Sequence, residues 1–188
     1  MSENHLPKNW QEWPLAEVGT WFGGGTPSKS KERFWRGSIL WVSPKDMKAL
    51  TILDTKDHIS EEAIEQSAAK LIPGGAVLFV TRSGILAHSF PVATTKSAVT
   101  INQDLKAIVP EPVIDPEYVG WCLRAYARLI LDRCTKDGTT VHSIEVPSLQ
   151  SFRIPIPPFN EQHRIVAKIE ELFSELDKGR NPEDRASN

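Results

Sequence analysis

The sequence predicts an α+β fold in which a mixed sheet with peripheral helices is followed by a C-terminal helix able to form a coiled coil. Three observations predict it: short β-rich runs separated by turn residues, an amphipathic segment after Asp115, and a heptad pattern near the carboxyl end. The 188 residues, 40% of them hydrophobic, suit one cored domain with an appendage. We expect that domain over residues 1–158, a spacer or dimerisation helix over 159–179, and a disordered tail over 180–188.

The expected strands are short runs of apolar or β-branched residues that end at glycine, proline or polar turn residues. Ser60 is placed to cap a short helix, because Glu61 and Glu62 follow it in the first turn, where the helix dipole favours acids. The expected strands cover residues 15–22, 39–42, 76–80, 87–93, 97–101 and 105–109.

One longer helix is expected from Asp115-Pro116 to about residue 133, since proline is favoured at the first helical position. Cys122 and Cys134 would then lie on the same face of that helix, too far apart to bridge each other. Neither belongs to a Cys-x-x-Cys pattern, so both are interpreted as reduced core thiols.

The C-terminal helix is expected after a cap at Asn160. Its apolar residues recur at spacings of four, three and four, which is a heptad seam. The seam packs either on its own domain or on a partner, and the preceding prolines favour a helix led away on a stiff connector. The expected partner interface is formed by Ile165, Ile169, Leu172, Phe173 and Leu176.

Charge and hydropathy narrow the class of protein only modestly. The formal net charge is −2, yet basic residues are concentrated between residues 23 and 48, which weakly favours a polyanionic ligand. No apolar run approaches the roughly 20 residues that span a bilayer. The first residues lack a secretory signal pattern, so we expect a cytoplasmic protein without membrane contact.

No arrangement of residues predicts catalysis, a cofactor or a metal. The glycines at 23–25 are not closed by Gly-Lys-Ser/Thr, as a phosphate-binding loop requires, and the five histidines match no metal spacing. An alternative is a metal-dependent nuclease that uses Asp46, Asp54 and Lys56; loop acids beside a surface lysine explain them better.

An ordered set of motifs makes the chain similar to one family. The set comprises Gly24-Gly25-Thr26-Pro27-Ser28, Ile39-Leu40-Trp41-Val42-Ser43-Pro44-Lys45-Asp46-Met47, Leu71-Ile72-Pro73-Gly74-Gly75, Thr81-Arg82, Ile101-Asn102-Gln103-Asp104 and Ile154-Pro155-Ile156-Pro157-Pro158-Phe159-Asn160-Glu161-Gln162. In order and spacing it resembles the target recognition domain and following helix of type I restriction-modification specificity subunits, from about residue 13 to 179.

The resemblance implies a non-catalytic, sequence-specific DNA-binding subunit that directs methylation and restriction subunits to a bipartite target. Such subunits usually hold two recognition domains, whereas this chain has one domain and one short helix. We therefore expect a half-subunit that forms a homodimer or pairs with a second half. A third class of function is an interaction module or inhibitor of such a complex that lacks DNA specificity of its own.

Candidate DNA contacts follow from residue type. Lysines in turns suit phosphates, whereas guanidinium and amide groups suit base edges, with arginine on guanine and Asn or Gln on adenine. Alternatives are solvated lysines, an ion pair for Arg82, turn hydrogen bonds for Asn102 and Gln103, and a cap for Thr139 and Thr140. The full set is Lys29, Lys31, Lys45 and Lys48 for phosphates, Arg82, Asn102 and Gln103 for bases, and Thr26, Ser28, Ser83, Thr139 and Thr140 in the same loops.

Overall fold

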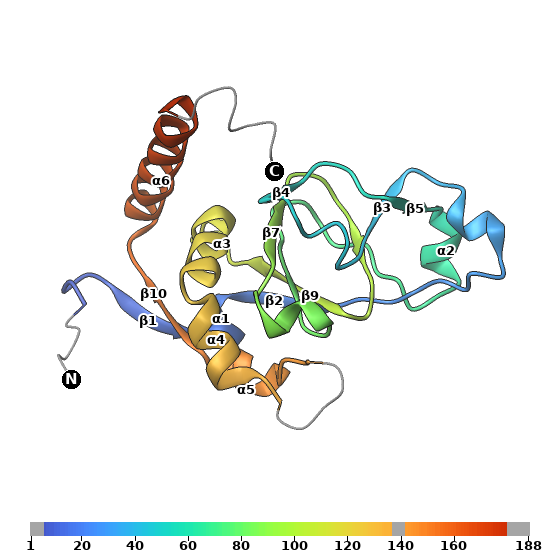
Figure 1. The fold of residues 1–188 in the computed structure, drawn as a ribbon, viewed down its shortest axis with the longest axis horizontal. Helices are drawn as coiled ribbons and strands as arrows, with labels where there is room; N and C mark the ends of the chain where they lie inside the picture. The colour runs from blue at the N-terminus through green and yellow to red at the C-terminus, as the bar shows by residue number, and fades with distance from the viewer. Residues whose placement is uncertain (1–5, 137–141, 180–188) are drawn as a thin grey trace.

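A five-stranded mixed sheet forms the centre of the chain (Figure 1). The computed structural model describes residues 6–136 and 142–179. All neighbouring strands are antiparallel except β7 and β4, which are parallel. The strand order is β2 (Gly19–Gly23), β9 (Leu105–Pro110), β6 (Val77–Val80), β7 (Val92–Thr95) and β4 (Thr51–Ile52).

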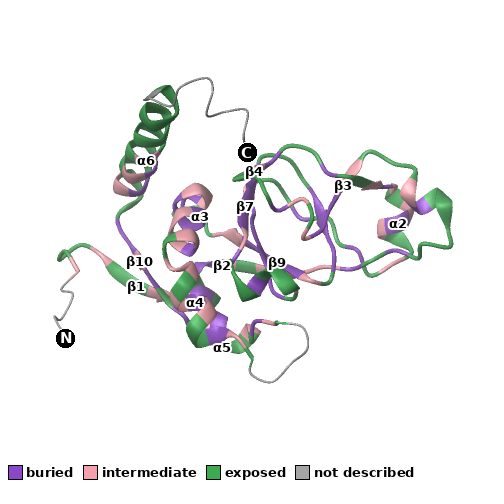
Figure 2. Ribbon diagram, viewed as in Figure 1, coloured by how far each residue is buried: buried purple, intermediate pink, exposed green. Residues whose placement is uncertain are grey.

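Helices cover this sheet and bury its central strand. Every residue of β6 is buried, as the uncharged run 76–80 predicts, and Figure 2 shows the neighbouring strand β7 coloured as buried. Helix α3 (Pro116–Ala125) packs on β7 and begins at Pro116 as predicted, and Asp115 caps it by accepting a hydrogen bond from Glu117 N at 2.7 Å. Two further helices, α4 (Ala127–Cys134) and α5 (Val146–Ser151), pack on each other.

A smaller second lobe, here called the distal lobe, lies at the opposite end from the carboxyl-terminal helix (Figure 1). Its apolar core of Phe34, Trp41, Ile59, Ala63 and Ala69 is separate from the main core. Ser60 caps α2 by accepting a hydrogen bond from Ala63 N, as predicted. The lobe comprises the 3-10 turn η1 (Glu32–Trp35), β3 (Ile39–Val42), β5 (Asp57–Ile59), α2 (Glu61–Glu65) and β8 (Thr100–Ile101).

The C-terminal helix α6 (Phe159–Gly179) follows a two-stranded ribbon of β1 (Gln11–Pro14) and β10 (Arg153–Ile156). It begins one residue before the predicted Asn160 cap, because the Pro158 carbonyl accepts hydrogen bonds from Glu161 N and Gln162 N. The helix does not simply leave the domain as expected: it packs against α3. Within the described residues, no helix has the length and apolar character needed to cross a membrane.

The predicted strand 15–22 is wrong in its first half, which forms the short helix α1 (Leu15–Val18). Leu15 and Val18 are both fully buried, and a helical turn brings residues three apart onto one side, where they pack beside α5. The strand then starts at Gly19, whose backbone lies against Val109 so closely that a Cβ would come within 2.1 Å of its carbonyl oxygen.

Three other predicted elements are shorter or broken. Residues 84–87 form the 3-10 turn η2 (Gly84–Ala87), capped by Ser83, so β7 starts only at residue 92. Strand 97–101 is reduced to β8. The helix expected over 116–133 breaks at Tyr126, after which α4 packs on α5 instead of the sheet. Cys122 and Cys134 therefore lie on different helices, both as free thiols.

Candidate nucleic-acid interface

The turn between β8 and β9 collects several predicted contact residues. Asn102 N donates to Val42 O at 2.9 Å, which joins the turn to the distal lobe. The Asn102 side chain accepts from Asp104 N at 3.0 Å and donates to Asp104 Oδ2 at 3.1 Å. Because Asn102 is buried and both ends of its amide are engaged, the residue stabilises the turn in this structure, as its alternative interpretation held.

Gln103 lies exposed at the tip of this turn and is hydrogen-bonded to the hydroxyl of Thr26. The contact joins the glycine loop to the turn, and Gly25 N adds a hydrogen bond to Ile101 O at 2.9 Å. Glycine is required at residue 24, since a Cβ there would lie 1.8 Å from Asn102 O. Thr26 and Gln103 are thus neighbours although 77 residues separate them in sequence.

Arg82 follows the end of β6 beside the same turn. Its Nε lies 3.3 Å from Asp104 Oδ1, and 65% of its side chain is exposed. The ion pair considered for Arg82 from the sequence therefore exists, although most of the side chain is exposed. Ser83 next to it caps η2 and donates its N–H to His142 O at 3.1 Å. Thr139 and Thr140 lie outside the described residues.

The four candidate lysines are exposed, but they are spread over two loops of the distal lobe and its base. Lys29, Lys45 and Lys48 form no ion pair with any described residue, while Lys31 lies over the Phe34 ring at 4.7 Å. Ser28 bonds Ser30 within the first loop. These lysine ammonium groups are available for an anionic ligand.

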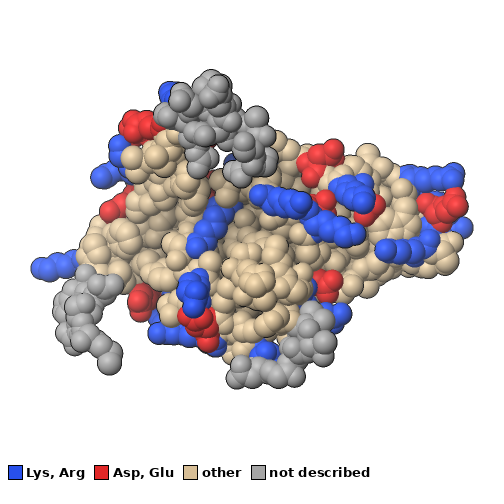
Figure 3. Space-filling view, in the orientation of Figure 1, with Lys and Arg blue, Asp and Glu red and all other residues tan. Residues whose placement is uncertain are grey.

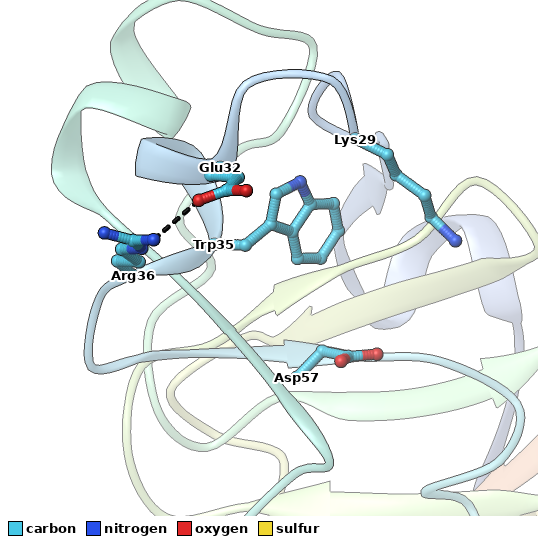
Figure 4. A pocket seen from close by; sticks show the side chains of 5 residues that line it. All are labelled: Lys29, Glu32, Trp35, Arg36 and Asp57. Atoms are coloured by element: carbon cyan, nitrogen blue, oxygen red, sulfur yellow. Dashed lines mark hydrogen bonds and ion pairs between the residues drawn. The ribbon is translucent and has the colours of Figure 1, made fainter.

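A hollow of about 410 Å³ beside the first loop is lined by Lys29, Glu32, Trp35, Arg36 and Asp57. Figure 4 shows the Trp35 indole at its centre, with Lys29 on one side and the Glu32–Arg36 ion pair on the other. Trp35 is held by a hydrogen bond from Nε1 to Ser28 O and by an edge-on contact with Trp41. Its indole therefore orients the basic loop.

Charge on the distal lobe is mixed. Arg33 pairs with Glu62 at 2.9 Å and Arg36 with Glu32 at 2.5 Å, so an acid balances the charge of each arginine although both side chains are exposed. Figure 3 shows acidic and basic side chains interleaved over this end of the molecule. An anionic ligand would find separate cationic positions here rather than a uniform basic face.

Lys106 is a candidate that the sequence did not single out. It lies on β9, paired in register with Gly23 and Phe79, and its Nζ lies where a Cβ on Gly23 would approach within 3.0 Å. A cation is thus placed at the base of the glycine loop. The only sequence signal is a charged residue between Leu105 and Ala107, which are fully buried.

The acids of the alternative nuclease interpretation have structural partners. Asp46 Oδ2 accepts hydrogen bonds from the Ser43 backbone and hydroxyl, both at 2.8 Å, and Oδ1 accepts from Lys56 N at 3.0 Å. Asp54 accepts from Thr55 N and contacts His58. Among the residues described, no three His, Cys, Asp or Glu side chains are grouped to hold a metal.

Some residues of the predicted helical interface pack on the chain's own domain, and others are exposed. Val166 is buried, Ile165 and Ile169 are partly buried, and Phe173 stacks on Trp121 of α3 at 5.3 Å between ring centroids. Leu172 and Leu176 remain 47% and 65% exposed. At 100° per residue Leu172 lies at the edge of the domain-facing stripe, whereas Leu176 lies within that stripe but near the end of the helix.

The chain is similar to known proteins over nearly its whole length. A family model described as the type I restriction modification DNA specificity domain matches residues 7–183. The type I restriction enzyme EcoR124I/EcoR124II specificity subunit of Escherichia coli is 43% identical over 173 residues, covering 89% of this chain and 43% of that protein. The MjaIX specificity subunit of Methanocaldococcus jannaschii is 27% identical over 174 residues, covering 91% of this chain and 39% of that protein.

Solved structures agree on the fold. The HsdS subunit from Thermoanaerobacter tengcongensis has a TM-score of 0.70 and 20% identity, over 100% of this chain and 42% of that chain. This likeness confirms the predicted α+β class. The chain spans less than half the length of the curated relatives it matches.

Proposed function

The chain belongs to the family of type I restriction modification DNA specificity domains, and from this premise we propose that it supplies one recognition half of a specificity subunit. In that role it reads one half of a bipartite DNA target for the methylation and restriction subunits. The observation that carries the proposal is the 102–104 turn, which holds Gln103, Thr26 and Arg82 together beside loops with unpaired lysines.

The candidate contacts divide by chemistry. Lys29, Lys45 and Lys48 would neutralise phosphates, which gives affinity without sequence information. Arg82 and Gln103 are exposed and carry the donors and acceptors that base edges require. Asn102, being buried, would act by holding the turn that presents them.

We propose residues 1–158 as the recognition domain and residues 159–179 as a spacer that also pairs with a second copy. Ile165, Ile169, Leu172 and Leu176 would form the seam of an antiparallel helix pair, since Leu172 and Leu176 are exposed apolar residues on one side of α6. Two copies related by a two-fold axis would read a palindrome interrupted by a spacer.

In this role the chain needs no catalytic activity, because the methylation and restriction subunits perform the reactions. Its ligand would be double-stranded DNA, and we propose a cytoplasmic location for the complex. The competing function, an interaction module or inhibitor, also fits an exposed helical seam but requires no affinity for DNA.

A binding titration separates these functions. The chain, with and without its methylation subunit, is titrated onto a random duplex pool at several salt concentrations, and bound duplexes are sequenced. We expect the logarithm of the binding constant to fall linearly with the logarithm of the salt concentration. The sequenced duplexes should be enriched in a motif with a gap. Salt-independent or undetectable binding, with the chain still bound to the methylation subunit, would instead support the interaction module.

A further inference from the structure

Asp104 is fixed to the end of β6 through its backbone. Its carbonyl oxygen accepts hydrogen bonds from Thr81 N at 2.8 Å, Arg82 N at 3.1 Å and Thr81 Oγ1 at 3.1 Å. The turn that carries Asp104 is therefore immobilised against the two residues from which the Arg82 side chain departs. The backbones that carry the Asp104 carboxylate and the Arg82 guanidinium are therefore hydrogen-bonded to each other.

The Asp104 carboxylate is also fixed in direction. Oδ2 accepts from Asn102 Nδ2 at 3.1 Å, which sets the plane of the group. Oδ1 is buried and makes no hydrogen bond to any described residue; its charge partner is Arg82 Nε at 3.3 Å. The Asp104 side chain is 22% exposed and that of Arg82 is 65% exposed, so the ion pair is sheltered at its carboxylate end only.

This geometry determines which part of the guanidinium is free. An arginine has five N–H donors in a planar guanidinium, and a contact at Nε leaves free the two N–H bonds at its outer edge, one on each terminal amino group. Those two groups are the ones that bind guanine O6 and N7 in the major groove. Holding Nε near a fixed carboxylate restricts the rotamers of a long side chain before DNA arrives, so less conformational freedom is lost on binding.

We propose that Asp104 is a positioning residue for sequence discrimination: it holds Arg82 so that its terminal fork meets one base pair of the target. The proposal rests on the proposed DNA-recognition function and assigns part of its specificity to a carboxylate that does not touch DNA. Asn102 supports Asp104 in turn, which gives its buried amide a place in the same unit.

The test compares wild-type chain, Arg82→Ala and Asp104→Asn, each assembled with the methylation subunit. Their affinities are measured for the selected duplex and for duplexes with every single base-pair substitution. We expect Arg82→Ala to lower discrimination at one position by roughly tenfold or more. Asp104→Asn should lower it at that same position and leave the others unchanged. In the Arg82→Ala background, Asp104→Asn should cause no further loss at that position, because the two residues act as one unit.

Asp132→Asn is the matched control, because Asp132 also pairs with an arginine Nε at 3.3 Å, on the exposed side of helix α4. It should leave all positions unchanged. Arg82→Lys, at an exposed residue, keeps the charge without the fork and should discriminate no better than Arg82→Ala.

Uniform losses at all positions from a folded Asp104→Asn variant, or unchanged discrimination, would overturn the positioning role while wild-type specificity still stands. A wild-type assembly that discriminates at no position would instead overturn the proposed function, and the positioning role with it.

Discussion

Gln162 is the residue that we expect to fix α6 to its domain. Its side chain is 1% exposed and forms three hydrogen bonds to main-chain groups. Oε1 accepts from Asp115 N at 2.8 Å, while Nε2 donates to Pro157 O at 2.9 Å and to Val113 O at 3.2 Å. These bonds join the first turn of α6 to the cap of α3 and to the connector that follows β10.

Gln162→Ala removes all three bonds and leaves at least the Asp115 N–H and the Pro157 carbonyl buried without a partner. Each net hydrogen bond contributes about 1 kcal/mol, and an unpaired buried group costs about 1–3 kcal/mol. We therefore expect the free energy of unfolding to fall by about 3 kcal/mol. Urea unfolding followed by circular dichroism measures it, at two protein concentrations so that dimer dissociation is separated from unfolding.

Gln66→Ala is the matched control, since Gln66 is exposed and, among the described residues, its side chain bonds to the Glu62 side chain alone, at 3.1 Å. This change should stay within about 0.5 kcal/mol of wild type. A loss below about 1 kcal/mol for Gln162→Ala, comparable with the control, would refute the anchoring of α6 by this side chain. The spacing between two recognition domains would then not be fixed by this joint.

Three further predictions concern DNA binding, assembly and pH. Lys29→Ala should weaken binding to every duplex alike and reduce the salt slope by about one unit, measured by anisotropy titration, whereas Lys168→Ala on α6 should not. Leu176→Asp should weaken a homodimer at least about tenfold in sedimentation experiments, since it places a charge in the apolar seam, while Leu53→Asp, at a more exposed leucine outside the seam, should leave assembly unchanged. Burial raises the pKa of the Cys122 thiol to about 11, so the folded chain retains a proton that the unfolded chain releases above about pH 8.5. Stability should therefore fall as pH rises through that window, and Cys122→Ala should reduce the slope; an unchanged slope would contradict it.

Local signals in the sequence predicted the elements that depend on few neighbours. Ser60 caps α2 and Pro116 begins α3 as expected, because both signals involve only residues within two or three positions. The run that forms β6 was also predictable locally, because its uncharged, apolar composition favours a buried central strand. The heptad residues also lie on a helix, as their spacing indicates.

Elements that depend on distant contacts were missed. The turn of α1 exists because Leu15 and Val18 pack beside α5, more than 120 residues away in sequence. The separate core of the distal lobe gathers Phe34, Trp41 and Ile59 from three segments; the pattern of residues 39–42 predicts a strand but not the residues that pack on it. Tertiary packing decides such cases over local propensity.

The candidate site was predictable by residue type but not by geometry. Arg82 and Gln103 could be chosen because their side chains suit base edges. The contact between Asp104 and Arg82 could not be predicted, because the strands β6 and β9 that bring them together are neighbours only in the folded sheet. Asn102 was chosen because its amide suits adenine, but both ends of that amide form hydrogen bonds to Asp104 within the turn.

The methylation pattern of a genome tests the central claim most directly. Cells that carry this chain and its cognate methylation subunit as the only specificity source are sequenced for modified bases. We predict an interrupted palindromic motif, read by two copies of the chain. A non-palindromic bipartite motif would contradict pairing with a second copy, and the absence of any new motif from a stably assembled complex would contradict DNA recognition itself.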